Sequence, residues 1–206
     1  MRENGKLARL AGTATLAALV ALMGIALPAG AAKKSRFVTK TKVVSSGNLA
    51  LPLPDVVGNG AETDDNVVRS TIKPKGIRNR ARIKDVNVSV RLDHTSDRDV
   101  NLYLASPKGV IRLSTDNGGI DDDYGTGADN CSGTPTVFDS QAPGLITAGT
   151  APFNGSFRPE ESLAGLKGIT GKVAKQRWTL IALDDNAAGE GTLFCWKLRF
   201  RVRTRT

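Results

Sequence analysis

Alternation of apolar and polar residues dominates the middle of the chain. Between residues 86 and 92, valine or leucine occupies every second position, with polar residues in between. The same alternation returns over residues 100–104, after a polar turn, and a third apolar segment, residues 110–113, follows Pro107-Lys108-Gly109. A period of two predicts strands with one buried face and one solvated face. We therefore expect three consecutive antiparallel strands that pack on a second layer.

Further strand signals lie on both sides of this region. Residues 67–72 are expected to form a strand, and residues 177–183 are apolar on both faces, which is typical of a covered central strand. In the last apolar segment, one face is expected to contribute core side chains from Phe194, Trp196, Leu198, Phe200 and Val202. Helix signals are weak, and Gly, Pro, Asn and Asp separate the strands. This pattern predicts an all-β sandwich.

The N-terminus has the organisation of a secretory signal peptide. Basic residues precede an apolar run over residues 10–27, and Pro28 and several small residues follow it. We expect residues 1–32 to be a signal peptide that is cleaved after Ala31 or Ala32, which implies a secreted, extracellular protein. An uncleaved anchor is the alternative, since the run approaches the roughly 18 apolar residues of a membrane span. No other segment is apolar enough to cross a membrane.

A short basic segment follows the predicted cleavage site, and a single domain follows that segment. Residues 33–48 are rich in Lys, Ser and Thr and are expected to form a linker or arm, with a peripheral strand as an alternative. Residues 49–206 have the length of one domain. The full chain of 206 residues carries a formal net charge of +9 at pH 7.

The two cysteines predict one disulfide bond, because an exported chain folds in an oxidising compartment. Cys195 alternates with the core-facing residues of the last strand, so its side chain is expected to point outward. A bond to Cys131 would then attach the loop before Cys131 to the outside of that strand. Two free thiols are the alternative.

That loop is the most chemically specialised part of the sequence. It carries Asp116, a run of three aspartates at residues 121–123 and several glycines. Zinc would need several His or Cys ligands, whereas the chain has one histidine and two cysteines. Carboxylate and carbonyl oxygens suit calcium or magnesium. The loop has no terminal bidentate Glu and so does not match an EF-hand, and a solvated acidic loop is the alternative.

An ordered set of segments resembles the P domain (P/Homo B domain) that follows the catalytic domain of kexin- and furin-like proprotein convertases. The segments are LPLPD, DHTSDRDV, LYLASPKG, TDNGG, APFNGSFRPEESLAGLKG and RWTLIALDDNAAGEGTLFCWKLRF. The resemblance covers residues 49–203. It implies a galactose-binding-like jelly-roll β-sandwich, calcium binding as in many bacterial members, and a stabilising role beside a protease.

The resemblance also extends the set of candidate ligands. The family pattern of His-Thr followed by Asp and an aliphatic residue falls on His94, Thr95, Asp99 and Val100, with Ser96-Asp97-Arg98 filling the turn. Asp139 matches an aspartate that the family often has, and Asp184 is either a ligand or a turn residue. The predicted calcium ligands are Asp99, Asp116, Asp121, Asp122, Asp123, Asp139 and Asp184. His94 is expected to be a hydrogen-bonded corner residue, and Trp178 and Trp196 are expected to be core.

These observations predict a non-catalytic module. A subtilisin-type triad needs a His base beside a Ser nucleophile, and the single histidine, His94, belongs to the P-domain turn motif. We expect a binding or stabilising accessory domain whose partner is another protein, such as a protease in trans, or the cell envelope. The alternatives are a hydrolase that acts at the acidic loop and a carbohydrate-binding module, although only 5% of residues are aromatic.

A basic row on the last strand offers a further binding surface. Lys197, Arg199, Arg201, Arg203 and Arg205 alternate there and, with the basic arm, could attract an anionic envelope, glycan or nucleic acid. Interleaved aromatic residues for base stacking are absent, so nucleic acid is not expected. Protection of a sheet edge by charge is the explanation that we favour from the sequence.

Overall fold

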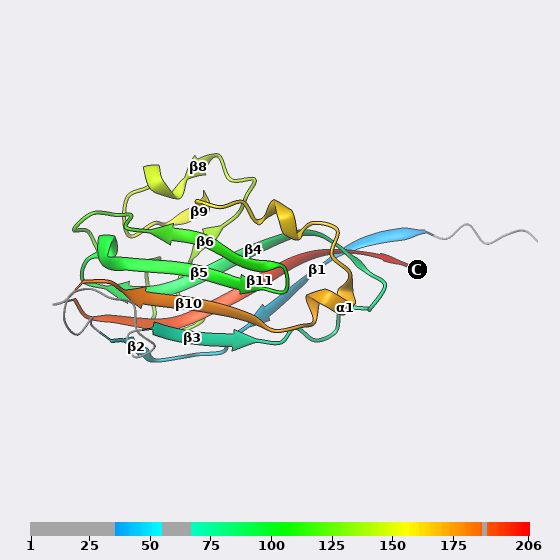
Figure 1. The fold of residues 1–206 in the computed structure, drawn as a ribbon, viewed down its shortest axis with the longest axis horizontal. Helices are drawn as coiled ribbons and strands as arrows, with labels where there is room; N and C mark the ends of the chain where they lie inside the picture. The colour runs from blue at the N-terminus through cyan, green and yellow to red at the C-terminus, as the bar shows by residue number, and fades with distance from the viewer. Residues whose placement is uncertain (1–35, 55–66, 187–188) are drawn as a thin grey trace, which may run out of the picture. The chain divides into compact units, whose positions relative to one another are not determined.

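The computed structural model describes residues 36–54, 67–186 and 189–206. These residues form a two-sheet β-sandwich (Figure 1), so the predicted all-β class is confirmed. The predicted signal peptide, residues 1–32, lies outside the described residues. No helix in the described part of the chain is long and apolar enough to cross a membrane.

The larger sheet has seven strands within the described residues, in the order β1-β11-β4-β7-β9-β8, and β2 pairs with β11. Their bounds are β1 Phe37–Ser45, β2 Leu51–Leu53, β4 Arg82–His94, β7 Thr136–Phe138, β8 Gly144–Leu145, β9 Gly155–Arg158 and β11 Gly191–Arg205. The smaller sheet has the order β3-β10-β5-β6, with β3 Val67–Ile72, β5 Val100–Ser106, β6 Gly109–Thr115 and β10 Trp178–Asp184. Short helices complete the described fold: η2 Asp97–Asp99, η3 Ile146–Ala148, η4 Leu163–Leu166 and α1 Gly171–Ala174.

The three strands expected to be consecutive neighbours are divided between the two sheets. β5 and β6 form the predicted antiparallel hairpin, but β4 lies in the larger sheet and β5 in the smaller one. The turn between β4 and β5 contains η2, which carries the chain across the sandwich. Alternation identifies the buried face of each strand and not its neighbour, so the expectation that β4 pairs with β5 was wrong.

Both tryptophans lie in the core, as the sequence predicts. Trp178 and Trp196 are each 0% exposed, and the ring of Trp178 packs edge-on against Phe200 at 5.4 Å between centroids. Each indole N–H is satisfied: Trp178 donates to the Ala174 carbonyl and Trp196 donates to the Ser70 hydroxyl, both at 2.9 Å. The rings therefore fill the sandwich and offer no exposed platform for a sugar.

A β-bulge changes which residues of β11 face the core. The pairing with β4 shifts register between Leu193 and Cys195, so Leu193 is fully buried while Phe194 is only partly buried. Phe194 lies under the guanidinium group of Arg91, 5.6 Å from its Cζ. The expectation that Phe194 shares the core face of Trp196 was wrong, because the extra residue of a bulge reverses the alternation beyond it.

Most of the segment expected to be a linker or arm is a strand of the larger sheet. β1 pairs antiparallel with β11 from Phe37↔Arg205 to Ser45↔Lys197. The alternative of a peripheral strand is therefore what the structure has. β11 consequently lies between β1 and β4, and its outward arginines are not on an edge strand.

Candidate functional site

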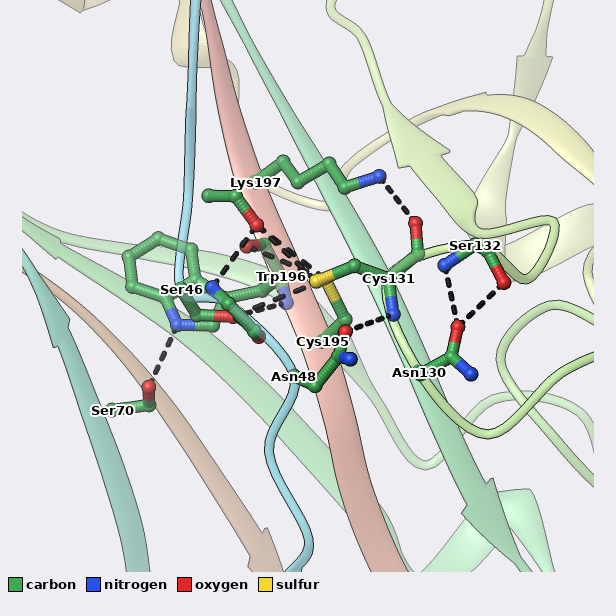
Figure 2. The surroundings of a disulfide bond; sticks show 11 residues. Ser46, Asn48, Ser70, Asn130, Cys131, Ser132, Cys195, Trp196 and Lys197 are labelled. Carbon is green, nitrogen blue, oxygen red and sulfur yellow. Dashed lines mark hydrogen bonds between the residues drawn. A yellow bond between two sulfur atoms is a disulfide. The ribbon is translucent and has the colours of Figure 1, made fainter.

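The acidic loop, residues 116–130, is attached to β11 at its C-terminal end. The predicted disulfide between Cys131 and Cys195 is confirmed. Lys197 Nζ donates to the Cys131 carbonyl at 2.7 Å, and the Cys131 amide donates to Asn48 Oδ1 at 3.0 Å (Figure 2). The bond lies on the outer side of the sheet, as expected, although Cys195 itself is only 3% exposed.

Arg91 is a buried cation that holds the middle of the acidic loop. Its guanidinium group pairs with Asp93 and, at 3.0 Å, with Asp129, and it donates to the Gly127 carbonyl at 3.3 Å. Asp123 lies further away, 3.8 Å from the same group. Arg91 is 3% exposed, whereas the side chains of Asp93 and Asp129 are 35% and 60% exposed, so the buried cation meets carboxylates at the surface. One side of the loop is thereby neutralised.

Asp97 lies on the other side of the loop and has no such partner. It is 0% exposed, and neither of its carboxylate oxygens has a hydrogen-bond partner in the structure. Its amide donates to the Asp121 carbonyl at 2.9 Å, and the amide of Arg98 donates to the Gly119 carbonyl at 3.1 Å. These two bonds hold η2 directly against the acidic loop.

A glycine makes this close approach possible. Gly118 has φ of +94°, and a Cβ atom placed on it would lie 2.7 Å from the Cβ atom of Asp97. Only glycine combines that backbone conformation with enough room for the neighbouring side chain. The acidic loop can therefore cover Asp97 and remove it from solvent.

The electrostatics follow from this burial. Desolvation raises the pKa of Asp97 to about 8, and the nearby carboxylates of Asp123, Asp122 and Asp121 also raise it, against the opposing effect of the Asp123 amide. Desolvation and Asp93 raise the pKa of Asp123 to about 6, against the opposing effect of the His94 amide and Arg91. An isolated buried carboxylate is costly, so Asp97 must either keep a proton or meet a cation.

A second acidic group lies nearby, around Asp116. Burial raises the pKa of Asp116, as do Asp185, Glu160 and Asp99. Asp99 accepts from Asn186 Nδ2 at 3.2 Å, and Asp185 accepts from Asn101 Nδ2 at 2.7 Å. This group is more open to solvent than Asp97, since Asp116 itself is exposed.

The predicted ligands are therefore not gathered at one point. Asp121, Asp122 and Asp123 lie near enough to Asp97 to raise its pKa, whereas Asp99 and Asp116 belong to the second group. Asp139 lies elsewhere, where it accepts from Asn87 Nδ2 and the Gln141 amide, both at 2.8 Å. Sequence reasoning did not select Asp97, which appeared only as part of the turn. The sequence feature that could have identified Asp97 is its position two residues before Asp99, as a second aspartate in the same turn.

Asp184 is the partner of the single histidine. His94 Nε2 lies 2.9 Å from Asp184 Oδ2, and His94 Nδ1 lies 2.7 Å from the Ser96 carbonyl oxygen. Both side chains of the His–Asp pair are 0% exposed. A Cβ atom on Gly191 would lie 2.4 Å from the imidazole, so the start of β11 closes over the ring. His94 is the hydrogen-bonded corner residue that the sequence predicts.

Removing Asp184 is expected to destabilise the fold. The variant Asp184→Ala would leave His94 Nε2 buried without a partner, which costs roughly 2–4 kcal/mol of unfolding free energy. Urea denaturation would measure the change, with Asp122→Ala, an exposed aspartate, as the control expected to stay within about 0.5 kcal/mol. Equal stability of the two variants would contradict a structural role for the pair.

The described residues contain no group of three or more histidine, cysteine or carboxylate side chains arranged to hold a metal ion together. A cation at Asp97 would therefore complete its coordination with main-chain carbonyls and water, which calcium accepts. The unpartnered carboxylate of Asp97 and the oxygen-rich loop around it fit this kind of ion.

Comparisons with known proteins add little to this geometry. No family model matches the chain, and no curated protein matches it significantly. Among solved structures, the serine protease of Aeromonas sobria in complex with a chaperone is similar at 17% identity with a TM-score of 0.36. The serine protease of Aeromonas sobria alone gives 16% and 0.32. Each match covers 81% of this chain and 27% of the other, and likeness at this level carries no argument about function.

Proposed function

We propose that this chain is a non-catalytic, P-domain-like module that binds calcium between η2 and the acidic loop and acts as an accessory domain for another protein. The resemblance of residues 49–203 to P domains supports the module type, and the disulfide supports an oxidising, extracellular location. The observation that carries the calcium proposal is the carboxylate of Asp97, which is buried, unpartnered and surrounded by further acidic residues.

The ion would be held by Asp97, with Asp123 and the carbonyl-rich loop around Asp121 as the nearest additional oxygen donors. A bound calcium ion would supply positive charge where η2 and the acidic loop meet. The chain's own residues preorganise the site: Gly118 admits the close approach, Arg91 fixes one side of the loop, and the disulfide anchors its end. Binding would thus rigidify the loop as a surface for a partner.

The burial and hydrogen bonds of His94 support a non-catalytic role. A general base must reach the proton that it abstracts. The imidazole of His94 is fully buried, and its two nitrogens face Asp184 and the Ser96 carbonyl. It therefore acts as a structural link between β4 and β10 in this proposal.

Thermal melting of the secreted protein tests the proposed calcium binding. At calcium concentrations of about 100 times Kd, a native-state ligand adds about 2.7 kcal/mol, which corresponds to a rise in Tm of roughly 5–10 °C over the value in EDTA. Magnesium at the same concentration is the control and is expected to shift Tm less, because it sheds water reluctantly. An identical Tm in EDTA and in saturating calcium would contradict the proposal.

The preferred partner is a protease supplied in trans, as the resemblance to P domains suggests. Pull-down of proteases from the producing cell's own secreted fraction, with calcium and with EDTA, would test this part separately. A calcium-dependent protease partner is the expected result. Proteolysis by the purified module itself would overturn the non-catalytic assignment.

A further inference from the structure

The end of the sandwich at which α1 lies (Figure 1) carries many cationic side chains, which line two hollows. Two adjoining hollows, of about 390 and 930 Å³, lie there, and they share Ile77, Arg78, Thr204 and Arg205 in their walls. Eight cationic side chains line the pair, and no Asp or Glu does. We call these residues the basic end: Lys40, Lys42, Arg78, Arg80, Arg82, Lys175, Arg203 and Arg205.

These residues converge from separate parts of the chain. Two come from β1, two from β11, one from the start of β4, and the others from the segment before β4 and the end of α1. None forms an ion pair with a carboxylate in the described residues. Two of them donate to main-chain carbonyls instead: Arg78 donates to that of Arg205 at 3.2 Å, and Arg82 donates to that of Gly168 at 3.1 Å.

Among the described residues of the walls there is one aromatic side chain, Phe37, which is 51% exposed and contacts two arginines. Arg203 lies over the ring of Phe37 at 4.1 Å and Arg205 lies over it at 5.5 Å. On the other side, the Nζ of Lys42 lies close to Gly76, 3.4 Å from the position that a Cβ atom there would take. The walls therefore offer one aromatic ring and no series of rings on which successive bases could stack.

Protection of a sheet edge can account for Lys40 and Lys42, which lie on the edge strand β1, but not for the other cations. Charged residues deter aggregation when they lie on an unpaired edge strand, but β11 is paired on both sides, with β1 and with β4. Arg78, Arg80 and Lys175 are not on strands at all. The explanation favoured from the sequence is therefore wrong for the basic row on β11, and an anionic partner would relieve the mutual repulsion of the basic end.

We propose that the basic end binds an extended polymer with phosphodiester groups along its chain, of the kind carried by cell envelopes. Five of the eight cations are arginines, whose planar guanidinium groups match phosphate oxygens in a bidentate way. The hollows adjoin each other, so a flexible chain can follow both. A single aromatic ring cannot stack successive bases, which argues against single-stranded nucleic acid, and the disulfide favours a compartment outside the cytosol.

Binding of the secreted protein to a poly(glycerol phosphate) chain, in EDTA, tests this proposal independently of calcium. The double variant Lys42→Gln/Arg80→Gln removes two exposed cations of the basic end. The matched control, Lys108→Gln/Arg158→Gln, removes one exposed Lys and one exposed Arg elsewhere. We expect the first variant to weaken binding roughly tenfold and to reduce its dependence on salt, because fewer counterions are released. The control should change affinity less than twofold.

Unchanged melting temperatures would show that both variants are folded. Equal loss of affinity in the two variants, or no binding by the unsubstituted protein, would overturn the proposal. Tighter binding to duplex DNA of the same charge, or to phosphatidylglycerol vesicles, would also overturn it by assigning the surface to a different partner. Uncharged dextran should not bind.

Discussion

Replacing Asp97 with asparagine is expected to stabilise the calcium-free protein at pH 8 and to abolish its stabilisation by calcium. The folded-state pKa of Asp97 is about 8, against an ordinary value of 3.8. The folded state thus binds a proton that the unfolded state has lost, so stability is highest below about pH 4 and falls as the pH rises towards 8. Asparagine has a neutral amide of the same shape, so the variant should not lose this stability as the pH rises. It also lacks the negative charge that would bind calcium.

Melting temperatures at pH 5 and pH 8, each in EDTA and in calcium, would measure both effects. We expect the unsubstituted protein to lose stability between pH 5 and pH 8 in EDTA and to regain it in calcium. The Asp97→Asn variant should show a smaller loss and no response to calcium. The control, Asp139→Asn, should respond to calcium like the unsubstituted protein, because Asp139 lies outside the site. A full calcium response in Asp97→Asn would rule out Asp97 as a ligand.

Removing the disulfide is expected to have the second largest effect. The Cys131–Cys195 bond closes a loop with a sequence separation of 64 residues. The chain-entropy relation assigns about 4 kcal/mol to such a loop. The double variant Cys131→Ser/Cys195→Ser should therefore lose about that much unfolding free energy in urea denaturation. It should also bind calcium more weakly, because the end of the acidic loop is released from β11.

The control for this experiment is Ser132→Ala, which changes an exposed hydroxyl next to the same attachment point. It should lose less than about 1 kcal/mol. If the double variant were no less stable than this control, the bond would not be the main attachment of the loop.

The sequence predicted the positions of strands that produce a clear pattern within their own residues. The alternation in residues 67–72 and the apolar segment before Asp184 correspond to β3 and β10, and β10 is central as predicted. The corner role of His94 and the core position of Trp178 were also correct. The bulge at Phe194 was not predictable in this way, because it depends on the pairing of β11 with β4 and not on the composition of β11.

The candidate site was only partly predictable for a similar reason. The acidic loop is conspicuous in composition, and Asp121, Asp122 and Asp123 were selected from it. Asp97 gains its properties only when η2 and the acidic loop meet through two main-chain hydrogen bonds and the close approach at Gly118. Burial of that kind is a property of the tertiary structure. The charge of the basic end likewise comes from segments that are distant in sequence.

A crystal structure of the secreted protein grown with calcium would test the central claim most directly. Anomalous scattering would locate the ion. The result we predict is a peak between η2 and the acidic loop, with a carboxylate oxygen of Asp97 at 2.3–2.6 Å and main-chain carbonyls among the other ligands. A crystal grown at saturating calcium with no ion at Asp97, or with calcium bound only by exposed carboxylates such as Asp122, would contradict the proposed site.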